Sequence, residues 1–347
     1  MIIDNKNIGL DSSPYIIAEM SANHNNDIEN AKKLIEEAKK NGADAIKLQT
    51  YKPDTITLNS SHEDFIIKDD GLWHGRTLYD LYEEAHMPWD WHKPLFEFAN
   101  KLDLTIFSSP FDKTAVDLLE DLNAPAYKIA SFEIVDIPLI QYVASTNKPI
   151  IISTGMADEE EIFEAIDAVK SSGTSDIAIL HCVSSYPAKP SEYNLKTIED
   201  MRKKFKVEVG ISDHTIDNVT AISSIAFGCT LIEKHFTLDR NAGGPDDSFS
   251  MEPSQLMSLS KDTKNARKAV GKINYSLKNN EKTNIKFRRS LYFVKDLSKG
   301  AIISEDDIAS VRPGYGVLPK HYHEIIGKTV NKDISKHTAV NFDDISN

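Results

Sequence analysis

The chain has 347 residues, of which 40% are hydrophobic and 27% charged, the proportions of a globular protein with ample apolar material for a core. Its formal net charge of −13 excludes nonspecific nucleic-acid binding, which relies on a positive surface. No stretch approaches the ~18 consecutive apolar residues of a membrane span, and the polar start MIIDNKNIGLDSS lacks signal-peptide features, so we expect a cytoplasmic protein without membrane contact.

Short β-rich runs alternate with segments of helical periodicity from residue 15 to about residue 270. This alternation is typical of a parallel sheet built from βα units. Eight strands are the number of a TIM barrel, so the sequence predicts an α/β fold with a (β/α)8 barrel over residues 1–275. The expected strands cover residues 15–20, 45–50, 104–109, 126–130, 149–154, 177–182, 207–212 and 231–236.

The segment DIENAKKLIEEAKKNG illustrates the helices that we expect between the strands. Ala31 and Leu34 share its apolar face, Asp27 can cap its start, and Gly42 can end it. The later connection over residues 52–87 exceeds the usual few residues of a βα loop, so we expect it to act as a lid over a site.

A polar stretch rich in lysine and asparagine, residues 276–287, is typical of a linker. Residues 288–347 then alternate short strand-like runs with turn signals such as Lys299-Gly300. This pattern predicts a small β-rich module of about 60 residues, whose core would gain stability by packing on another surface.

Polar residues gather at the C-terminal ends of the expected strands, which converge on one mouth of a barrel where the active site lies. Lys47 and Lys128 are the strongest candidates, because a buried lysine without a partner costs several kcal/mol. Lysines and hydroxyls together suit a phosphorylated, carboxylated small molecule, although single serines could equally satisfy turns. The set comprises Glu19, Lys47, Gln49, Ser109, Lys128, Ser131, Glu133, Ser153, Ser184, Tyr186, Ser212, His214 and His235.

His214 and His235 end neighbouring strands, so their imidazoles could reach one metal ion. Two nitrogen ligands would leave positions open for water and a substrate oxygen. Such a pair taken alone could equally be two hydrogen-bonded structural histidines.

Eight motifs occur in the order IIAEMSANHNND, GADAIKLQTYKPD, FSSPFD, YKIASFE, IISTGMA, HCVSSYP, VGISDHT and IEKHFTLD. With them, the sequence resembles the sialic acid synthase family of phosphoenolpyruvate-dependent sugar-acid synthases, essentially from end to end. RRSLY and SVRPGYGVLPK, within residues 288–347, resemble the antifreeze-like (SAF) domain that this family carries after its barrel.

The resemblance implies a condensation in which C3 of phosphoenolpyruvate attacks the open-chain aldehyde of an N-acetylated amino sugar, followed by water addition and loss of phosphate. It implies a divalent metal, usually Mn²⁺ with Mg²⁺ or Co²⁺ as alternatives, held by His214 and His235. The phosphoenolpyruvate-binding positions correspond to Lys47, Ser109, Lys128, Ser131, Ser153, Ser184 and Ser212.

Five further positions take roles from the same resemblance. Glu19 matches a carboxylate that handles a proton near the metal-bound water or the sugar hydroxyls, and Glu133 matches one near the reacting carbons that can stabilise an oxocarbenium. Gln49 and Tyr186 match positions on the sugar side. Arg312 corresponds to an arginine that reaches the sugar site of the partner subunit, which implies a domain-swapped homodimer.

Within the family, SANH at residues 21–24 and the long second loop are most similar to the pseudaminic acid synthases. The implied sugar is 2,4-diacetamido-2,4,6-trideoxy-L-altrose, and the products are pseudaminate and phosphate. The methyl group of this sugar suits an apolar surface, for which Phe65, Leu72 and Trp73 of the expected lid are candidates, although the same side chains could equally pack within the lid. An N-acetylneuraminate or legionaminate synthase, acting on N-acetylmannosamine or a diacetamido-trideoxy-mannose, remains the alternative.

Two readings from other classes compete with this one. One is a noncatalytic sugar-binding barrel, and loss of a mouth lysine or histidine would favour it. The other is an aldolase that uses Lys47 or Lys128 as a Schiff base. Borohydride trapping with substrate would reveal its covalent adduct.

Overall fold

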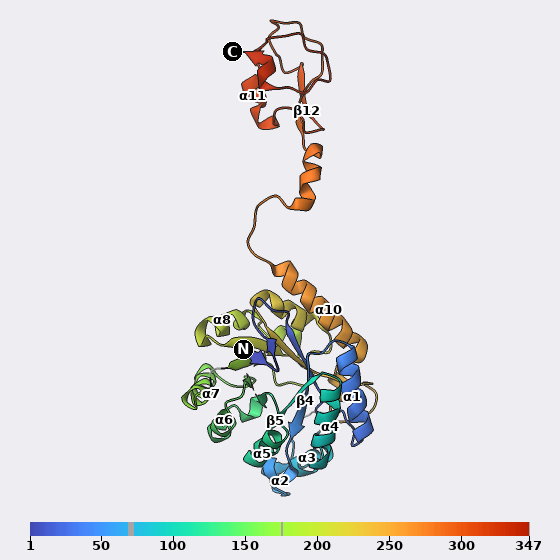
Figure 1. The fold of residues 1–347 in the computed structure, drawn as a ribbon, viewed down its shortest axis with the longest axis vertical. Helices are drawn as coiled ribbons and strands as arrows, with labels where there is room; N and C mark the ends of the chain where they lie inside the picture. Colours follow the sequence, from blue (N-terminus) through green and yellow to red (C-terminus); the bar gives the residue numbers. More distant parts are fainter. Residues whose placement is uncertain (69–72, 175, 347) are drawn as a thin grey trace. The chain divides into compact units, whose positions relative to one another are not determined.

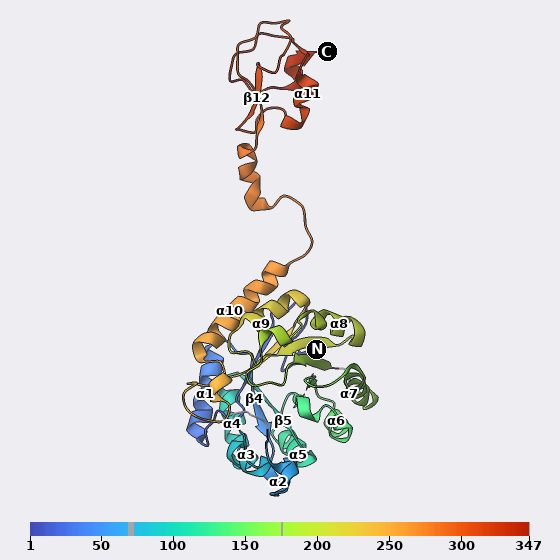
Figure 2. The ribbon, with the colours of Figure 1, turned by 180° about the vertical axis from the view of Figure 1, so that it is seen from behind.

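The structure is a computed structural model that describes residues 1–68, 73–174 and 176–346. The chain forms two compact units, Met1–Gly271 and Lys272–Asn347 (Figures 1 and 2). Within the described ranges, none of the helices has the length and apolar character needed to cross a membrane.

Eight parallel strands close the first unit into a barrel, which confirms the predicted (β/α)8 architecture. Each expected strand is present, and its ends differ from the expected ones by at most one residue. The last strand pairs with the first, so that His235 lies opposite Glu19. Around the barrel the strands are β3 (Tyr15–Glu19), β4 (Ala45–Thr50), β5 (Thr105–Pro110), β6 (Tyr127–Ile129), β7 (Ile150–Ser153), β8 (Ile177–Cys182), β9 (Glu208–Ser212) and β10 (Leu231–His235).

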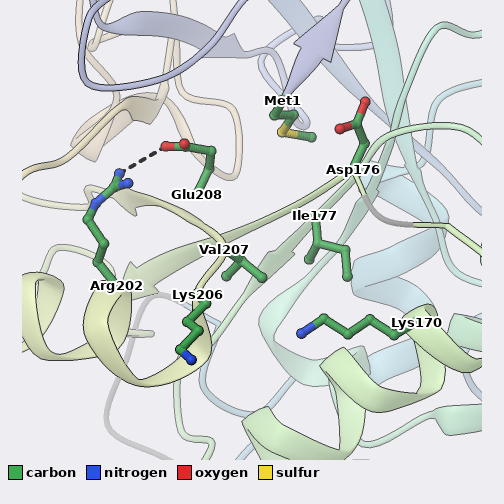
Figure 3. A pocket seen from close by; sticks show the side chains of 8 residues that line it. All are labelled: Met1, Lys170, Asp176, Ile177, Arg202, Lys206, Val207 and Glu208. Carbon is green, nitrogen blue, oxygen red and sulfur yellow. Dashed lines mark hydrogen bonds and ion pairs between the residues drawn. The ribbon is translucent and has the colours of Figure 1, made fainter.

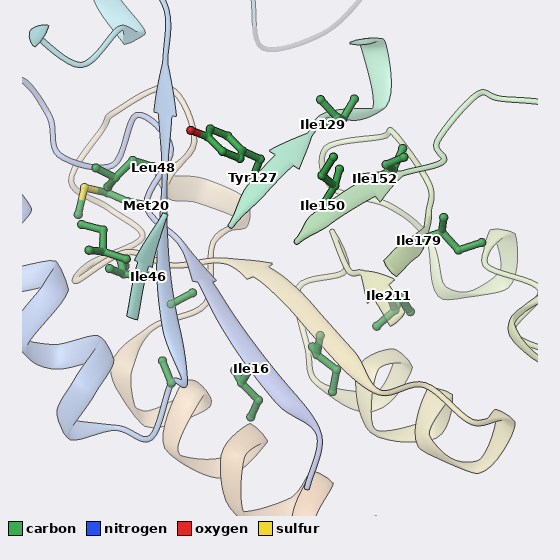
Figure 4. Close-up of a cluster of buried hydrophobic side chains, with 14 of the residues drawn as sticks. Ile16, Met20, Ile46, Leu48, Tyr127, Ile129, Ile150, Ile152, Ile179 and Ile211 are labelled. Carbon is green, nitrogen blue, oxygen red and sulfur yellow. The ribbon is translucent and has the colours of Figure 1, made fainter. Parts of the chain in front are cut away.

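Helices surround the barrel and pack on the outer faces of its strands through the main apolar core (Figures 1 and 4). The first helix is built as its sequence predicts: the Asp27 carboxylate accepts a hydrogen bond from the Glu29 N–H, and Ala31 and Leu34 are buried. The helices are α1 (Ile28–Lys40), α4 (Trp89–Lys101), α5 (Lys113–Asp121), α6 (Ile137–Ala144), α7 (Glu159–Ser171), α8 (Lys196–Phe205), α9 (Val219–Ser224) and α10 (Pro253–Val270).

The inner faces of the same strands form a second apolar cluster, which fills the N-terminal half of the barrel. We call it the barrel floor. Gly210 belongs to this level, because a Cβ there would lie 2.4 Å from the Leu231 carbonyl oxygen and 2.6 Å from the Leu180 side chain. Since side chains alternate along a strand, residues two positions further on point inward above the floor. The floor comprises Tyr15, Ile17, Ala45, Phe107, Ala126, Ile151, Ala178, Leu180 and Leu231, together with Ile3 and Ile8 of the N-terminal segment.

The N-terminal segment and the long second connection add short elements to the barrel. Ile3 belongs to a small antiparallel ladder, β1 (Ile2–Ile3) with β2 (Lys6–Asn7). The long connection contains α2 (Pro53–Ile56), a 3-10 turn (Glu63–Phe65) and α3 (Leu78–Ala85). Of the three apolar residues expected there, Phe65 and Trp73 are half-buried, whereas Leu72 lies outside the described residues.

The second unit has its own small core, as expected for a β-rich module. Residues 271–289 are exposed throughout and include the 3-10 helix η6 (Asn279–Phe287). Beyond them the chain forms the ladders β11 (Ser290–Phe293) with β12 (Ile308–Val311) and β13 (Thr329–Val330) with β14 (Ile345–Ser346), and the short helix α11 (Tyr322–Ile325). The core comprises Leu291, Phe293, Ile303, Ile308, Ile325, Val330, Ile334 and Val340.

Candidate active site

Directly above the barrel floor, buried lysines and carboxylates from β3, β4, β6 and β10 face one another. Lys47 lies 2.7 Å from the Glu19 carboxylate and donates a hydrogen bond to the Ser109 hydroxyl at 3.1 Å. Lys128 on β6 is equally buried, and its ammonium group donates to the Ile129 carbonyl oxygen at 3.2 Å. The two lysines singled out from the sequence therefore both lie in the buried interior of the barrel.

Glu233 is the acidic residue that joins these two lysines, and the sequence analysis did not single it out. Its Oε1 lies 3.8 Å from the ammonium nitrogen of Lys47 and 3.7 Å from that of Lys128. The Ser212 hydroxyl donates to the same oxygen at 3.5 Å. Glu233 precedes His235 by two residues on β10, so strand alternation alone would have predicted that it faces the same interior.

In this cluster, burial and the neighbouring charges shift the pKa of each residue in opposite directions. Which of the two effects is larger differs from residue to residue. Burial alone would lower the pKa of Lys47, but Glu19 and Glu233 outweigh it and raise that pKa. Burial lowers the pKa of Lys128, although Glu233 opposes this shift. Burial would raise the pKa of Glu233, but Lys128 and Lys47 lower it overall. Lys47 and Glu233 are thus held in their charged forms although both are buried, whereas burial weakens the charged form of Lys128.

Hydroxyls from the ends of β6, β7 and β8 surround Gly155 beside the lysines. The Gly155 N–H donates to the Ser131 hydroxyl at 3.2 Å. An added Cβ at Gly155 would lie 2.2 Å from the Ser184 hydroxyl oxygen. The Ser153 hydroxyl is buried and has no hydrogen-bond partner among the described residues. The Ser131 hydroxyl donates to the Cys182 sulfur at 3.5 Å, so Ser153 is the hydroxyl left open. Hydroxyls next to two lysines form a suitable place for an oxyanion.

His214 and His235 bring their rings together at the mouth, with centroids 5.5 Å apart. The Nδ1 atom of His214 lies 2.8 Å from the Val183 carbonyl oxygen, which places a proton on Nδ1, and its Nε2 atom lies 3.3 Å from the Ser212 hydroxyl. Burial holds the pKa of His235 well below its usual value, and the charge of His214 adds to this effect. The Tyr186 ring packs beside both histidines, at 4.3 Å from His214 and 5.8 Å from His235.

This pair fits a divalent metal that takes its remaining ligands from water and substrate. Among the residues that the structure describes, no group of three or more His, Cys, Asp or Glu side chains is arranged to hold a metal ion. Neutral imidazoles are nevertheless suitable ligands. The buried Nδ1 of His235 has no hydrogen-bond partner within the described ranges and lies 3.7 Å from the Asp246 carboxylate. Residues for a two-histidine site are therefore present.

Two glutamates at the site have strongly raised pKa values. Burial raises the pKa of Glu133 to about 7, although the nearby Lys128 partly opposes the shift. Burial also raises the pKa of Glu19 to about 7, with Lys47 lowering it and Glu233 raising it. Carboxyl groups with such values can exchange a proton near neutral pH, which is the property required of a general acid or base.

The remaining predicted residues fall in two places. Gln49 lies at the mouth, where its amide nitrogen donates to Glu19 at 3.1 Å and to the Ser21 hydroxyl at 2.9 Å. Arg312 lies in the second unit, where it is exposed. The other predicted site residues all belong to the mouth of the barrel.

A separate pocket of about 410 Å³ opens at the other end of the barrel, where β8 and β9 begin (Figure 3). Ile177 and Glu208 line it together with Arg202, which pairs with Glu208 at 2.9 Å. None of the residues that line it was predicted as part of the site.

Residues 34–275 match the NeuB family, and residues 288–346 match the SAF domain. This chain belongs to the NeuB family. As a family member it is a phosphoenolpyruvate-dependent sugar-acid synthase, a transferase. The antifreeze-like domain expected after the barrel is confirmed.

Among relatives of known name, the chain is 44% identical to the pseudaminic acid synthase of Campylobacter jejuni serotype O:2, over 94% of this chain and 95% of that protein. It is 37% identical to the N,N'-diacetyllegionaminic acid synthase of the same serotype, over 94% and 98%. Among solved structures, an N-acetylneuraminic acid synthetase from Leptospira borgpetersenii, determined with citrate, matches with a TM-score of 0.73 and 29% identity, covering 82% of this chain and 94% of that one.

Replacing Gly155 of this NeuB-family protein with alanine is expected to raise the KM for phosphoenolpyruvate about tenfold. The new Cβ would displace the Ser184 and Ser131 hydroxyls, which lie 2.2 and 2.9 Å from its position. Loss of one such hydrogen bond is worth about 1.4 kcal/mol. Steady-state kinetics should detect the change, and Gly9→Ala is the control, because its Cβ would meet only Glu208 at 3.7 Å. An unchanged KM would contradict a phosphate site at these hydroxyls.

Replacing Glu133 with glutamine is expected to stabilise the ligand-free protein at pH 8 but not at pH 4. Because burial raises the pKa of Glu133 to about 7 from 4.5, the folded protein binds more protons than the unfolded chain between these values. This carboxyl therefore lowers stability as the pH rises through that window. Thermal melts of both proteins from pH 4 to 8 should diverge with increasing pH, and parallel curves would contradict the raised pKa.

Proposed function

We propose that this protein is a pseudaminic acid synthase, which condenses phosphoenolpyruvate with 2,4-diacetamido-2,4,6-trideoxy-L-altrose and water to give pseudaminate and phosphate. The observation that supports the chemistry is that Lys47 and Lys128 pair with Glu233, two residues before His235 on β10, and that the Ser212 hydroxyl contacts both Glu233 and His214. The choice of sugar rests on the relatives, since identity to the pseudaminic acid synthase of C. jejuni is 44%, against 37% for the legionaminic acid synthase of the same serotype. Membership of the NeuB family argues against the noncatalytic and Schiff-base readings.

In the proposed reaction, phosphoenolpyruvate binds deepest in the barrel. Lys47 and Lys128 hold its two anionic groups, and Ser109, Ser131, Ser153, Ser184 and Ser212 donate hydrogen bonds. Both ammonium groups pair with Glu233 in the absence of substrate, so the substrate exchanges one set of ion pairs for another. This exchange limits the desolvation cost, because the lysines never lie buried without a partner.

The proposed cofactor is a divalent metal, with Mn²⁺ the first candidate, held by His214 and His235. A bound metal polarises the aldehyde oxygen of the open-chain sugar. Burial holds the pKa of His235 well below its usual value, so this imidazole remains neutral at working pH and keeps a lone pair for the ion.

Glu133 and Glu19 supply the proton chemistry in this proposal. Glu133 follows β6 beside Lys128, so its carboxylate is suited to stabilise positive charge that develops on C2 of phosphoenolpyruvate after C3 attacks the aldehyde. Glu19 pairs with Lys47 at 2.7 Å and accepts from Gln49, which orients it towards a proton on the sugar side. Their pKa values of about 7 allow both carboxyls to change protonation during the reaction.

We further propose a cytoplasmic, domain-swapped homodimer in which Arg312 reaches the partner's sugar site. Large apolar side chains are exposed in the segments that follow β6, β7 and β9, around the mouth: Phe132, Val135, Met156, Ile216 and Val219. Tyr315 and Leu318, close to Arg312 in sequence, are exposed as well. Two exposed apolar surfaces of this kind support a contact between copies of the chain.

Mixing two inactive variants tests the swap. In a Lys128→Met and Arg312→Ala heterodimer, one intact barrel would receive the intact arginine of its partner, so activity should reappear after co-refolding. Absence of recovery, with heterodimers shown by native mass spectrometry, would contradict it.

A substrate panel tests the choice of sugar. Purified protein with phosphoenolpyruvate and Mn²⁺ is expected to release phosphate with the diacetamido-trideoxy-altrose and at least tenfold more slowly with N-acetylmannosamine or the diacetamido-trideoxy-mannose. Preferred turnover of either alternative would overturn the assignment to pseudaminate.

A further inference from the structure

Ser21 has a backbone conformation that is unfavourable for any residue with a side chain. It lies two residues after the end of β3 at the mouth, and its φ of +46° lies in the left-handed region. Glycine adopts this region without a steric cost, so a serine there needs a compensating contact. The side chain of Ser21 is buried, with 6% of its surface exposed, and its hydroxyl makes two short hydrogen bonds.

These bonds connect the sugar side of the site with its metal side. The Ser21 hydroxyl donates to Asp246 Oδ2 at 2.5 Å, and the same carboxylate oxygen lies 3.7 Å from His235 Nδ1. Ser21 Oγ also accepts a hydrogen bond from the Gln49 amide nitrogen at 2.9 Å, and that nitrogen donates to Glu19 as well. A continuous chain of contacts therefore runs from Glu19 to His235 through Ser21.

The order of donors and acceptors in these hydrogen bonds fixes the orientation of the Gln49 amide. The Ser21 hydroxyl donates its single proton to Asp246, and its oxygen accepts from the Gln49 amide nitrogen. The NH₂ group of Gln49 must then face Ser21. Its carbonyl oxygen, Oε1, points the other way, and among the described residues no hydrogen bond to it is present.

Two acceptors hold the amide in this orientation. The Gln49 amide nitrogen donates to Glu19 at 3.1 Å and to Ser21 Oγ at 2.9 Å, and Ser21 is in turn held by Asp246.

We propose that Ser21 is a positioning residue for sugar recognition: it holds the Gln49 amide so that Oε1 accepts a hydrogen bond from a hydroxyl or acetamido N–H of the amino sugar. This rests on the proposed function, in which Gln49 lies on the sugar side. A sugar that presents only an acceptor at this point would meet the carbonyl oxygen and bind poorly.

Two variants distinguish the effect of losing the Ser21 hydroxyl from the effect of relieving the backbone strain at this position. Ser21→Ala removes the hydroxyl and keeps a side chain at positive φ, whereas Ser21→Gly removes both the hydroxyl and the strain, so it is the variant expected to fold most readily. Ser224→Ala is the control, since Ser224 is buried in α9, where its hydroxyl donates to the Ala221 carbonyl oxygen. The measurements are KM for the diacetamido-trideoxy-altrose, KM for phosphoenolpyruvate, and kcat.

Both Ser21 variants should raise the KM for the sugar about tenfold, the equivalent of one hydrogen bond, with the KM for phosphoenolpyruvate within twofold of wild type. Equal increases in both KM values, or an unchanged sugar KM in both variants while the wild type is active, would overturn this inference alone. A wild-type protein that turns over none of the candidate sugars would overturn the proposed function, and this inference with it.

Discussion

Replacing Lys128 with methionine is expected to lower kcat/KM for phosphoenolpyruvate by about 10³-fold. Methionine matches the length of the lysine stem but brings no charge, so one anionic group of the substrate would lose its partner in a site with little water. Glu233 would also keep only Lys47 as a cationic partner, at 3.8 Å, and would repel the incoming anion. Titration calorimetry with phosphoenolpyruvate and steady-state kinetics should both register the loss.

Lys148→Met is the matched control for this substitution. Lys148 pairs with Glu120 at 2.6 Å on the outside of the barrel, so its loss should leave phosphoenolpyruvate binding unchanged. If Lys128→Met stays folded, as judged by circular dichroism, and still binds phosphoenolpyruvate with wild-type affinity, the placement of the phosphate or carboxylate at Lys128 is wrong.

Replacing His235 with glutamine is expected to weaken Mn²⁺ binding about 10²-fold or more and to abolish phosphate release. The two-histidine site would lose half of its protein ligands, and no third His, Cys, Asp or Glu in the described part of the chain is arranged to replace it. Electron paramagnetic resonance measures the concentration of free Mn²⁺, so it gives the Mn²⁺ affinity of each variant independently of its activity. A chelator should likewise inactivate the wild type, and added Mn²⁺ should restore it.

His181→Gln provides the comparison for the metal site. His181 lies on β8, where its Nε2 contacts the Tyr193 carbonyl oxygen. The His181→Gln variant carries the same type of substitution away from the metal site, so the protein should retain its Mn²⁺ affinity. Wild-type Mn²⁺ affinity in His235→Gln would refute the assignment of this histidine as a ligand.

The barrel could be predicted from the sequence because each strand is a short apolar run between helices with a clear periodicity. All eight strands begin and end within one residue of the predicted positions, since burial on both faces leaves a parallel strand few polar positions of its own. The lysines within β4 and β6 are conspicuous for the same reason. Charges are rare in such strands, so the positions of Lys47 and Lys128 in the sequence are enough to indicate a site.

Contacts that join distant parts of the chain could not be predicted in this way. Glu233 was overlooked because it is one of several polar residues in LIEKHF, and only the inward direction of its side chain distinguishes it from Lys234, which pairs with Asp213 at 3.0 Å. Asp246 lies in the connection after β10, and its approach to Ser21 depends on how that loop folds back. Periodicity carries no information about such an approach.

The barrel floor closes the lysine cluster on the side where the strands begin. Lys47 and Lys128 lie two residues beyond Ala45 and Ala126 of the floor and pair with Glu233, whereas His235 lies two residues beyond Glu233 on β10. In the proposed reaction, inorganic phosphate is therefore released next to the barrel floor, and the newly made nine-carbon acid lies between it and the mouth of the barrel. The larger product must depart first, and accumulated phosphate should compete with the next molecule of phosphoenolpyruvate rather than with the sugar.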